Sequence, residues 1–408
     1  MPPSIPDDRR PLILHITGDY PDPTRTPTTV AIKHLIDGLT GCDHLIVSLT
    51  RTADPRRLQV RDFKLTGQQN IIAIHHFGLP FGVGLYLSFK AVARQIETLL
   101  IERNIRPDMV HSHRLTFDGI AGWLIAAQRE IPHVVSVRGE VESKVLRFKP
   151  TYRPLIRRIL KSAHRIYYVS AWFRPQIEQL AGPQPNKSRP LPNIVANTRP
   201  TVTPRPPNKS IVAVANLDIY QKKGIDRLIA AFAMAEARLP GIELDIIGGG
   251  SAESTARVSR LIDNTGLQHR IHLRGPLKND EFLAELPDAL ALALPSRNET
   301  FGMVYTEALF AGVPILYGRG TGIDGHLSGL DVGIALNPDD VSSIAAGLID
   351  LVSNNARYRT AIQTAGPELF RRFDPVRQIA LYMADIPAGI PPRMADGAVP
   401  ASHELTQS

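Results

Sequence analysis

Short apolar runs alternate with longer amphipathic segments from the beginning of the chain. Runs rich in aliphatic and β-branched residues predict strands at 12–16, 44–48, 71–75, 109–111, 133–137 and 165–169. Apolar positions at helical spacing predict helices between them, most clearly at 85–104, 119–130 and 153–163. Strands that alternate with helices form right-handed crossovers on a mostly parallel sheet. The first part of the chain is therefore predicted to be an α/β domain.

The alternation stops at a proline-rich segment and then starts again. Five prolines lie between Pro192 and Pro207, where neither a helix nor a central strand can form. We interpret 192–207 as a linker between an N-terminal domain, 1–191, and a C-terminal domain, 208–373. The second domain is predicted to have strands at 210–216, 243–247, 271–274, 289–294 and 314–317, with helices at 224–238, 251–265 and 304–311. A final helix, 374–386, could pack back on the first domain, and 387–408 is expected to be a disordered tail.

Composition narrows the class of protein. The 408 residues are 43% hydrophobic and 21% charged, as in folded globular proteins, and the lone cysteine, Cys42, excludes an intramolecular disulfide framework. No run approaches the roughly 20 apolar residues that span a bilayer. Residues 1–10 lack the apolar run of a signal peptide. We therefore expect a cytoplasmic protein.

Positive charge is concentrated in the N-terminal domain. Up to Val195 the chain has 27 basic and 16 acidic residues, a formal charge of +11, whereas the remainder has 20 basic and 23 acidic residues, or −3. This asymmetry predicts an anionic partner for the first domain: a nucleic acid, an anionic lipid or a phosphorylated acceptor. The aromatic content of 6% argues against nucleic acid, because binders of single strands need stacking platforms.

One basic segment carries much of that charge. Between 144 and 174 there are nine basic residues and no acidic one, and aliphatic residues interleave with them at Leu155, Ile156, Ile159, Leu160 and Ile166. This pattern is typical of a basic amphipathic helix that lies on an anionic membrane surface. A solvated basic helix is the alternative. Peripheral contact with the inner face of the plasma membrane is therefore one of two interpretations.

The most informative stretch is 295–314, PSRNETFGMVYTEALFAGVP, which directly follows a predicted strand. A loop there lies at the carboxyl edge of a parallel sheet, where open α/β domains bind ligands. Glu299 in this loop and Glu307 on the next helix can accept hydrogen bonds from sugar and ribose hydroxyls. Taken singly, Glu299 could be a helix cap and Glu307 a surface residue. The helix is expected to start with backbone N–H groups directed at a phosphate, from Thr300, Phe301, Gly302 and Met303.

With these offsets the stretch resembles the retaining glycosyltransferases of family 4, which have the GT-B fold of two Rossmann-like domains facing a central cleft. The resemblance implies that Glu299 contacts the sugar of a nucleotide diphosphate donor and that Glu307 contacts its ribose. It also implies that transfer retains the anomeric configuration, with the leaving phosphate oxygen taking the acceptor proton. Because the nucleotide sugar is a substrate, no cofactor is expected.

A second match, 214–232 or VANLDIYQKKGIDRLIAAF, resembles the family's strand, loop and Lys-Gly start of an amphipathic helix. A lysine at a helix N-terminus opposes the helix dipole, so we interpret Lys223 as the cation that neutralises the donor diphosphate. The family more often has arginine where this chain has Asn216. One of two cations expected on the leaving group is therefore missing, unless Lys222 or Arg297 replaces it.

Further donor contacts follow from the same resemblance. Gly248 and Gly249 end a predicted strand and let the backbone approach a ligand, although consecutive glycines are also ordinary in tight turns. Arg274 lies in a segment that meets the nucleotide base in the family. The first loop has prolines and threonines where the family has glycines, so Gly18 and Thr28 are the candidate diphosphate contacts there. An ordinary N-capped loop is the alternative.

The N-terminal domain supplies the acceptor side. His111 and His113 end a predicted strand and resemble the family's His-small-His pattern, which implies that His113 faces the donor sugar. Two histidines on one face of a strand also suggest a metal site, but no third ligand of suitable spacing accompanies them. The sequence has no Asp-any-Asp triplet to hold a divalent ion on a diphosphate, so we expect no metal. Arg138, in a turn that resembles the family's Arg-Gly, and His111 are the candidate acceptor-side residues.

These patterns together predict a retaining, metal-independent glycosyltransferase. It would move a sugar from a nucleotide diphosphate donor to a glycan, lipid-linked or small-molecule acceptor, in cell-surface polysaccharide synthesis. Asn216 and the unusual first loop leave a catalytically silent sugar-nucleotide binder of the same fold as the alternative. A nicotinamide dehydrogenase is disfavoured, because Gly18 stands alone where a Gly-x-Gly-x-x-Gly turn would follow the first strand.

Overall fold

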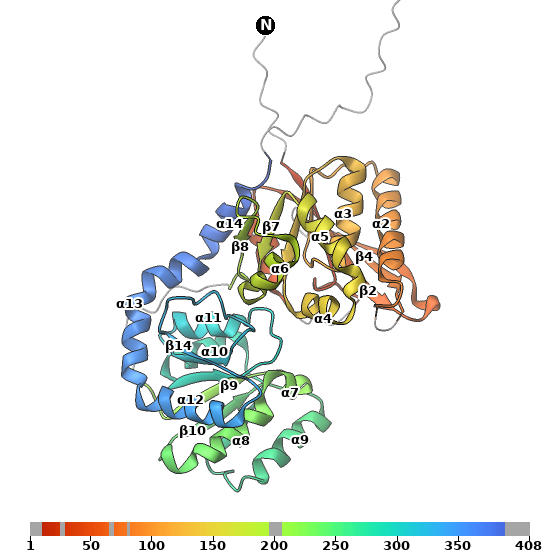
Figure 1. The fold of residues 1–408 in the computed structure, drawn as a ribbon. Helices are drawn as coiled ribbons and strands as arrows, with labels where there is room; N and C mark the ends of the chain where they lie inside the picture. Colours follow the sequence, from red (N-terminus) through yellow and green to blue (C-terminus); the bar gives the residue numbers. More distant parts are fainter. Residues whose placement is uncertain (1–9, 25–28, 65–68, 80–81, 196–205, 388–408) are drawn as a thin grey trace, which may run out of the picture.

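The structure, a computed structural model, describes residues 10–24, 29–64, 69–79, 82–195 and 206–387. Figure 1 shows two α/β domains, one built from each half of the chain, with the last helices along one side of both. Each domain has its own mostly parallel sheet. The predicted α/β class with two Rossmann-like domains is confirmed. Thr28, most of the predicted linker and nearly all of the predicted tail lie outside the described residues.

The first domain is built on an eight-stranded sheet in the order β3-β4-β2-β1-β5-β6-β7-β8. Neighbouring strands run parallel except β3 and β4, which form an antiparallel pair at one edge. Because β1 lies between β2 and β5, the crossovers leave it in both directions and open a crevice at its carboxyl end. The strands are β1 (Leu12–Thr17), β2 (Asp43–Thr52), β3 (Gln59–Lys64), β4 (Gln69–Phe77), β5 (Met109–Ser112), β6 (His133–Val137), β7 (Arg165–Tyr168) and β8 (Ser188–Pro190).

Helices of the first domain bury one apolar stripe each against this sheet. In α2 the stripe has helical spacing, and its members are at most 6% exposed: Phe89, Val92, Ile96 and Leu100. The same core receives Ile120 and Ile125 of α3. The helices are α1 (Ala31–Gly38), α2 (Leu85–Glu102), α3 (Asp118–Arg129), α4 (Glu140–Phe148), α5 (Arg153–Ser162) and α6 (Arg174–Ala181).

The second domain has a six-stranded parallel sheet in the order β11-β10-β9-β12-β13-β14. Here β9 lies between β10 and β12, so a second crevice opens at the carboxyl ends of β9 and β12. The loops that follow these two strands contain the two motifs singled out in the sequence. The strands are β9 (Ser210–Val214), β10 (Glu243–Ile247), β11 (Ile271–Gly275), β12 (Ala291–Leu294), β13 (Ile315–Gly318) and β14 (Gly333–Leu336).

The last helix crosses to the first domain. Tyr382 of α14 is fully buried in a cluster with Ile13, Leu35 and Met109, and the following Asp385 accepts a hydrogen bond of 2.7 Å from Tyr167. Figure 1 shows α13 alongside the second domain and α14 beside β7 and β8 of the first. The helices are α7 (Tyr220–Lys223), α8 (Ile225–Ala235), α9 (Ala252–Asp263), α10 (Asn279–Glu285), α11 (Met303–Phe310), α12 (Val341–Ser353), α13 (Asn355–Phe373) and α14 (Pro375–Met383).

The apolar stripe of α5, the helix in the basic segment, does not face outward. Ile156, Ile159 and Leu160 of α5 have no exposed surface, because they pack into the core of the first domain. The interpretation of this helix as one that lies in a bilayer surface is therefore wrong. Its basic side chains form a solvated outer face, as the alternative interpretation has it; Arg158, for example, lies over the ring of Trp123.

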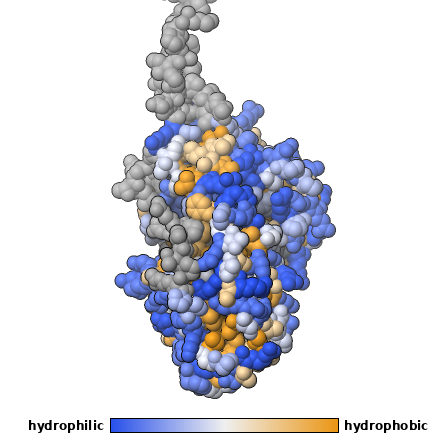
Figure 2. Space-filling model, turned by 90° about the vertical axis from the view of Figure 1, so that its left-hand side faces the viewer, coloured by the Kyte–Doolittle hydropathy of each residue, from blue (hydrophilic) through white to orange (hydrophobic). Residues whose placement is uncertain are grey.

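The surface is mainly hydrophilic. Figure 2 shows the face that carries α13 and α14, where hydrophilic residues cover most of the area and apolar residues gather in small patches. Over the described surface, the large apolar side chains with the most exposure are Val376, Phe148, Leu87 and Ile101. Among the described residues, no helix is both long enough and apolar enough to cross a membrane.

Candidate functional site

The two motifs of the second domain meet at its crevice. The backbone N–H of Arg297, in the loop after β12, donates to the carbonyl of Lys222, which follows β9, at 2.7 Å. The hydroxyl of Ser296 donates to the carbonyl of Lys223 at 3.4 Å. Two loops that lie 73 residues or more apart in the sequence are thus joined by hydrogen bonds to backbone carbonyls. The predicted donor residues on these loops are brought together in one place.

Lys223 and Glu299 form an ion pair in this crevice. Their side chains are 20% and 14% exposed, so the pair is only partly screened by water. Lys223 is the last residue of α7 and precedes Gly224, the left-handed N-cap of α8. A cation is favoured at the C-terminus of α7 and disfavoured at the N-terminus of α8. The helix dipole therefore does not identify Lys223 as an anion-binding residue. Its contact with Glu299 does.

The helix α11 begins within one residue of the predicted bound at 304, but after the residues whose N–H groups were expected to open it. Its first residue is Met303, and Gly302 is an N-cap with φ 76°, so Thr300, Phe301 and Gly302 lie in the loop. A Cβ at Gly302 would lie 2.5 Å from the ring of Tyr305, which explains the glycine. Phe301 is fully buried against His326, so only its backbone can meet a ligand. The carbonyl of Thr300 accepts a hydrogen bond of 2.6 Å from Ser170 of the first domain.

Glu307 offers an unused carboxyl group one turn into α11. Burial raises its pKa to about 7. Its carboxyl group has no hydrogen-bond or ion-pair partner among the residues that the structure describes. A half-buried carboxyl without a partner is costly unless a ligand supplies donors. The group can accept hydrogen bonds from the two hydroxyls of a ribose.

Lys222 has a different partner from its neighbour. Its Nζ lies 2.6 Å from Oε1 of Glu140, at the start of α4 in the first domain. Beside it, the amide of Asn298 donates to the carbonyl of Glu140 at 3.3 Å. Lys222 therefore holds the two domains together in this arrangement, and it could neutralise a diphosphate only by leaving Glu140.

The other predicted cations of the donor site are also paired. Arg297 forms an ion pair with Asp339, and Arg274 lies 3.2 Å from Glu285. Asn216 is exposed, and its side chain accepts a hydrogen bond of 2.8 Å from the backbone N–H of Asp218, which caps a short 3₁₀ turn. Lys223 is consequently the one predicted donor-site cation whose partner, Glu299, is itself a predicted donor contact.

Packing requires a glycine at only one of the two positions after β10, Gly248 and Gly249. Gly248 has φ 143°, and a Cβ there would lie 1.8 Å from the carbonyl oxygen of Ala215. Gly249 has room, because its Cβ would lie 3.5 Å from Pro276. Gly248 is thus required by the close approach of β9 and β10, whereas packing does not explain Gly249.

In the first domain, His113 ends a chain of buried imidazoles from three strands. The carbonyl of Leu39 can only accept, so His44 donates to it from Nε2 at 2.9 Å and its Nδ1 is a bare acceptor. His15 must then donate from Nε2 to that nitrogen at 3.1 Å. The remaining Nδ1 of His15 accepts from Nε2 of His113, also at 3.1 Å. The chain ends at Nδ1 of His113, a lone pair that has no partner among the described residues.

These imidazoles are neutral. Burial is the main reason that the pKa of His15, His111 and His113 lies well below its ordinary value, and it also lowers the pKa of His44. His15 supplies a third ring beside His111 and His113, where the sequence predicted no further metal ligand. The hydrogen bonds already engage most of these ring nitrogens, so a metal ion would have to displace them.

We expect the protein to lose stability as the pH falls below about 6.5, the ordinary pKa of histidine. The unfolded chain takes up protons there, whereas the buried imidazoles stay neutral, so each such group lowers the free energy of unfolding by about 1.4 kcal/mol at pH 5.5. Urea denaturation at pH 7.5 and 5.5 measures this. Among the described residues, three carboxyl groups with raised pKa have the opposite effect: Asp118, Glu142 and Glu307. They are fewer than the imidazoles with lowered pKa, which are the seven histidines His15, His44, His76, His111, His113, His133 and His326. Equal stability at both pH values would contradict the neutral chain.

The structure gives His111 and Arg138 structural contacts. Nδ1 of His111 lies 3.0 Å from the hydroxyl of Tyr382 and its Nε2 lies 2.9 Å from that of Ser136, so neither nitrogen is left for an acceptor. Arg138 is 7% exposed and donates from Nε to the carbonyl of His113 at 2.9 Å. His111 therefore holds α14 in place, and Arg138 holds the backbone of His113. In this arrangement both side chains are engaged within the protein.

The crevice of the first domain contains a buried polar group that the sequence motifs did not indicate. Asp118, the first residue of α3, is 1% exposed, and burial raises its pKa to about 7. Its carboxylate accepts a hydrogen bond from the backbone N–H of Gly18, and Arg114 beside it pairs with Asp19. A Cβ at Gly18 would lie 3.0 Å from the Arg114 guanidinium. An acid that follows a parallel strand was the available signal.

Two family models match most of the chain. The model of the glycosyl transferases group 1 matches residues 198–368, and that of the glycosyl transferase 4-like domain matches residues 28–193. The boundary between the two matches falls within the proline-rich segment. Each match corresponds to one of the two domains in the structure.

Comparisons over the whole chain agree with these matches. Glycogen synthase of Mycobacterium tuberculosis is 25% identical over 397 residues, which cover 89% of this chain and 91% of that protein. A GDP-mannose-dependent alpha-(1-6)-phosphatidylinositol monomannoside mannosyltransferase of the same species is 26% identical over 239 residues, 54% of this chain and 60% of that protein. The structure of Anabaena Alr3699/HepE in complex with UDP and glucose has a TM-score of 0.62 and 16% identity, covering 91% of this chain and 99% of that one. The last of these shows a shared fold.

Proposed function

This chain belongs to the group 1 glycosyltransferases, and on that premise we propose that it is an active retaining enzyme that binds a nucleotide diphosphate sugar in the crevice of its second domain. The observation that carries the proposal is the Lys223–Glu299 ion pair in this crevice. Glu307, on the helix that follows the Glu299 loop, adds a carboxyl group without a partner among the described residues. The acceptor binds in the first domain. A role in the synthesis of cell-surface polysaccharide, at the inner face of the plasma membrane, is part of this proposal.

The ion pair occupies the place that the donor would take. A diphosphate carries more negative charge than one carboxylate, so it draws the ammonium group of Lys223 away from Glu299. Glu299 is then free to accept hydrogen bonds from hydroxyls of the sugar. One exchange of partners thus prepares both the leaving group and the sugar, and the charge of the crevice stays balanced before binding.

Transfer by this arrangement needs no protein nucleophile. The bond between the anomeric carbon and the phosphate oxygen breaks, the acceptor oxygen bonds to the same face of that carbon, and its proton passes to the departing phosphate. Lys223 stabilises the negative charge that grows on the phosphate. We expect this cation to act without a metal ion. His113 has no exposed surface, so its bare Nδ1 accepts a sugar hydroxyl only when neighbouring groups move.

We expect nucleoside diphosphate binding to strengthen as the pH rises from 6 to 8. The pKa of Glu307 is raised to about 7 by burial, and ribose hydroxyls bond best to the ionised form. Isothermal titration with UDP and with GDP at both pH values measures the effect. Ionisation of the terminal phosphate adds its own dependence in this range, and Glu307→Gln separates the two because it removes only the carboxyl group. A variant with an unchanged pH profile would show that Glu307 does not bind the ribose.

A silent sugar-nucleotide binder is the second candidate, because Asn216 caps a turn where a cation is expected. Thermal shift with a panel of nucleotide sugars identifies the donor, since a ligand that binds only the native state raises the melting temperature. Release of the nucleotide is then measured with and without acceptors. Acceptor-dependent release supports the enzyme, and donor binding without it supports the silent binder.

A further inference from the structure

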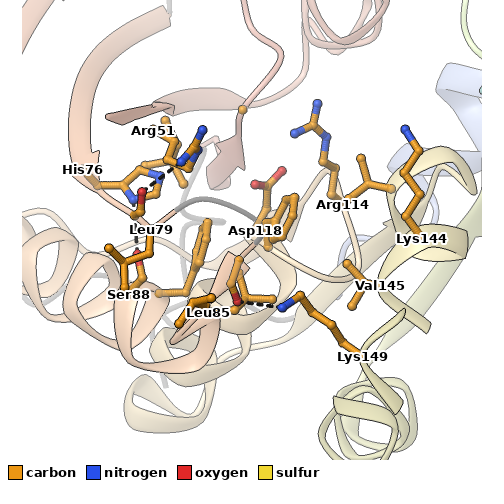
Figure 3. A pocket seen from close by; sticks show the side chains of 18 of the residues that line it. Arg51, His76, Leu79, Leu85, Ser88, Arg114, Asp118, Lys144, Val145 and Lys149 are labelled. Carbon is orange, nitrogen blue, oxygen red and sulfur yellow. Dashed lines mark hydrogen bonds between the residues drawn. The ribbon is translucent and has the colours of Figure 1, made fainter. Parts of the chain in front are cut away.

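A cavity of about 750 Å³ lies in the first domain, apart from the donor crevice of the second. Its walls come from the carboxyl ends of β1, β2 and β4, from the start of α2 and α3, and from α4. Figure 3 shows the charged tips of Arg51, Asp118, Arg114 and Lys144 along one side of the view, with Leu79, Leu85 and Val145 below them. The cavity therefore has a charged side and a mainly apolar side, where Lys149 donates to the carbonyl of Gly82 at 3.2 Å.

Apolar side chains at the mouth are unusually exposed. Val83 is 57% exposed, Leu79 is 43% exposed and Phe148 is 71% exposed, and all three line the cavity. Phe117, Leu85 and Phe89 continue the apolar surface inward. Exposed apolar side chains at the mouth of a cavity with an apolar lining are typical of a binding site for an apolar group. The walls are too apolar to be matched by a free sugar.

The charged side has an unsatisfied acceptor between cations. Oδ2 of Asp118 is buried and has no hydrogen-bond partner among the described residues. A ligand hydroxyl would satisfy this oxygen. Lys144, on the rim, has no ion-pair partner in the described part of the chain. Arg51 has none there either, and its guanidinium donates to the carbonyl of Gly78 at 2.9 Å. These two cations are thus available to an anion that enters with the hydroxyl.

We propose that this cavity binds the acceptor as a phosphate-bearing lipid, with a head-group hydroxyl on Asp118, the phosphate between Arg51 and Lys144, and the apolar chain along Leu79, Val83 and Phe148. Its role as the acceptor site rests on the proposed function. A free sugar phosphate leaves the apolar wall in water, and a neutral lipid leaves the two cations without a counter-charge. A phosphorylated amphiphile satisfies both sides.

The test uses three probes on the full chain: decyl phosphate below its micellar concentration, inorganic phosphate and the uncharged decyl maltoside. Isothermal titration is expected to show binding of decyl phosphate at least about tenfold tighter than of either control, because each control offers only one of the two chemistries. Val83→Glu, which puts a carboxylate on the apolar wall, should weaken the binding of decyl phosphate at least about tenfold. Ile101→Glu is the matched control, since Ile101 is 66% exposed at the far end of α2, and should change it less than about twofold.

Lys144→Gln tests the charged side. We expect about fivefold weaker binding of decyl phosphate and unchanged binding of decyl maltoside, because one exposed lysine contributes about 1 kcal/mol to an anionic lipid. Binding of UDP and GDP is measured on the same samples. If they bind while decyl phosphate does not, or if Val83→Glu and Ile101→Glu behave alike, the lipid site is refuted and the proposed enzyme stands. Binding of decyl phosphate without any nucleotide or nucleotide sugar would support the cavity and refute the enzyme.

Discussion

Lys223→Met should reduce the rate of sugar transfer by about 10²–10³-fold, because one fixed cation beside a departing phosphate contributes about 3–4 kcal/mol to the transition state. Methionine keeps the length and apolar stem of lysine and removes only the charge. Lys223 is 20% exposed, and its native partner Glu299 would be left without a counter-charge in a partly covered site. We therefore also expect weaker binding of nucleoside diphosphates, which isothermal titration would measure alongside the transfer rate.

Lys222→Met is the matched control for this prediction. The two lysines are adjacent in α7, but Lys222 pairs with Glu140 of the first domain at 2.6 Å. Its loss removes a partly exposed ion pair, which is typically about 1 kcal/mol or less, so the transfer rate should fall by less than about tenfold. If Lys222→Met lowers the transfer rate more than Lys223→Met does, Lys222 is the cation that contacts the diphosphate. It would then supply the charge that is missing at Asn216.

The meeting of the two motif loops could be predicted because it depends on local order along the chain. Each motif directly follows a strand, and loops after parallel strands share one edge of the sheet. The structure places Lys223 after β9 and Glu299 after β12, which are neighbours, so the two side chains meet. The sequence did not show which backbone N–H groups open α11, because a left-handed Gly302 leaves Thr300 and Phe301 in the loop before Met303.

The histidine chain could not be predicted because it depends on strand order. His15, His44 and His113 lie on β1, on β2 and just after β5, and nothing in their sequence spacing shows that β1 separates the other two. For the same reason the sequence offered only His111 and His113 as neighbours. Contacts between strands far apart in the chain are decided by how the whole sheet assembles.

The basic helix α5 shows a different limit. A helix that buries its apolar stripe on its own domain and one that buries it in a bilayer have the same pattern of apolar and basic residues. The core of the first domain takes Ile156, Ile159 and Leu160. The apolar residues left exposed, such as Val83 and Phe148, lie singly beside glycines or at the end of a helix, where no periodicity marks them.

Gly248→Ala should lower the free energy of unfolding by about 3 kcal/mol or more, since it combines a strained backbone with an overlap in the core. The new Cβ would lie 1.8 Å from the carbonyl oxygen of Ala215, and the φ of 143° is one that alanine rarely adopts. Either β9 or β10 must move, and β9 leads directly into the loop that carries Lys223. Urea denaturation measures the loss, and nucleotide binding measured on the folded fraction should fall as well.

Gly249→Ala is the control that separates packing from ligand contact. Its Cβ would lie 3.5 Å from Pro276, an ordinary contact, so stability should change by less than about 0.5 kcal/mol. If the backbone at Gly249 also lies against the bound nucleotide, the same methyl group weakens UDP or GDP binding without weakening the fold. Loss of stability equal to that of Gly248→Ala would contradict the backbone geometry, whereas full stability with full binding would show that the nucleotide does not approach Gly249, because a methyl group leaves no room for a ligand in van der Waals contact with the glycine.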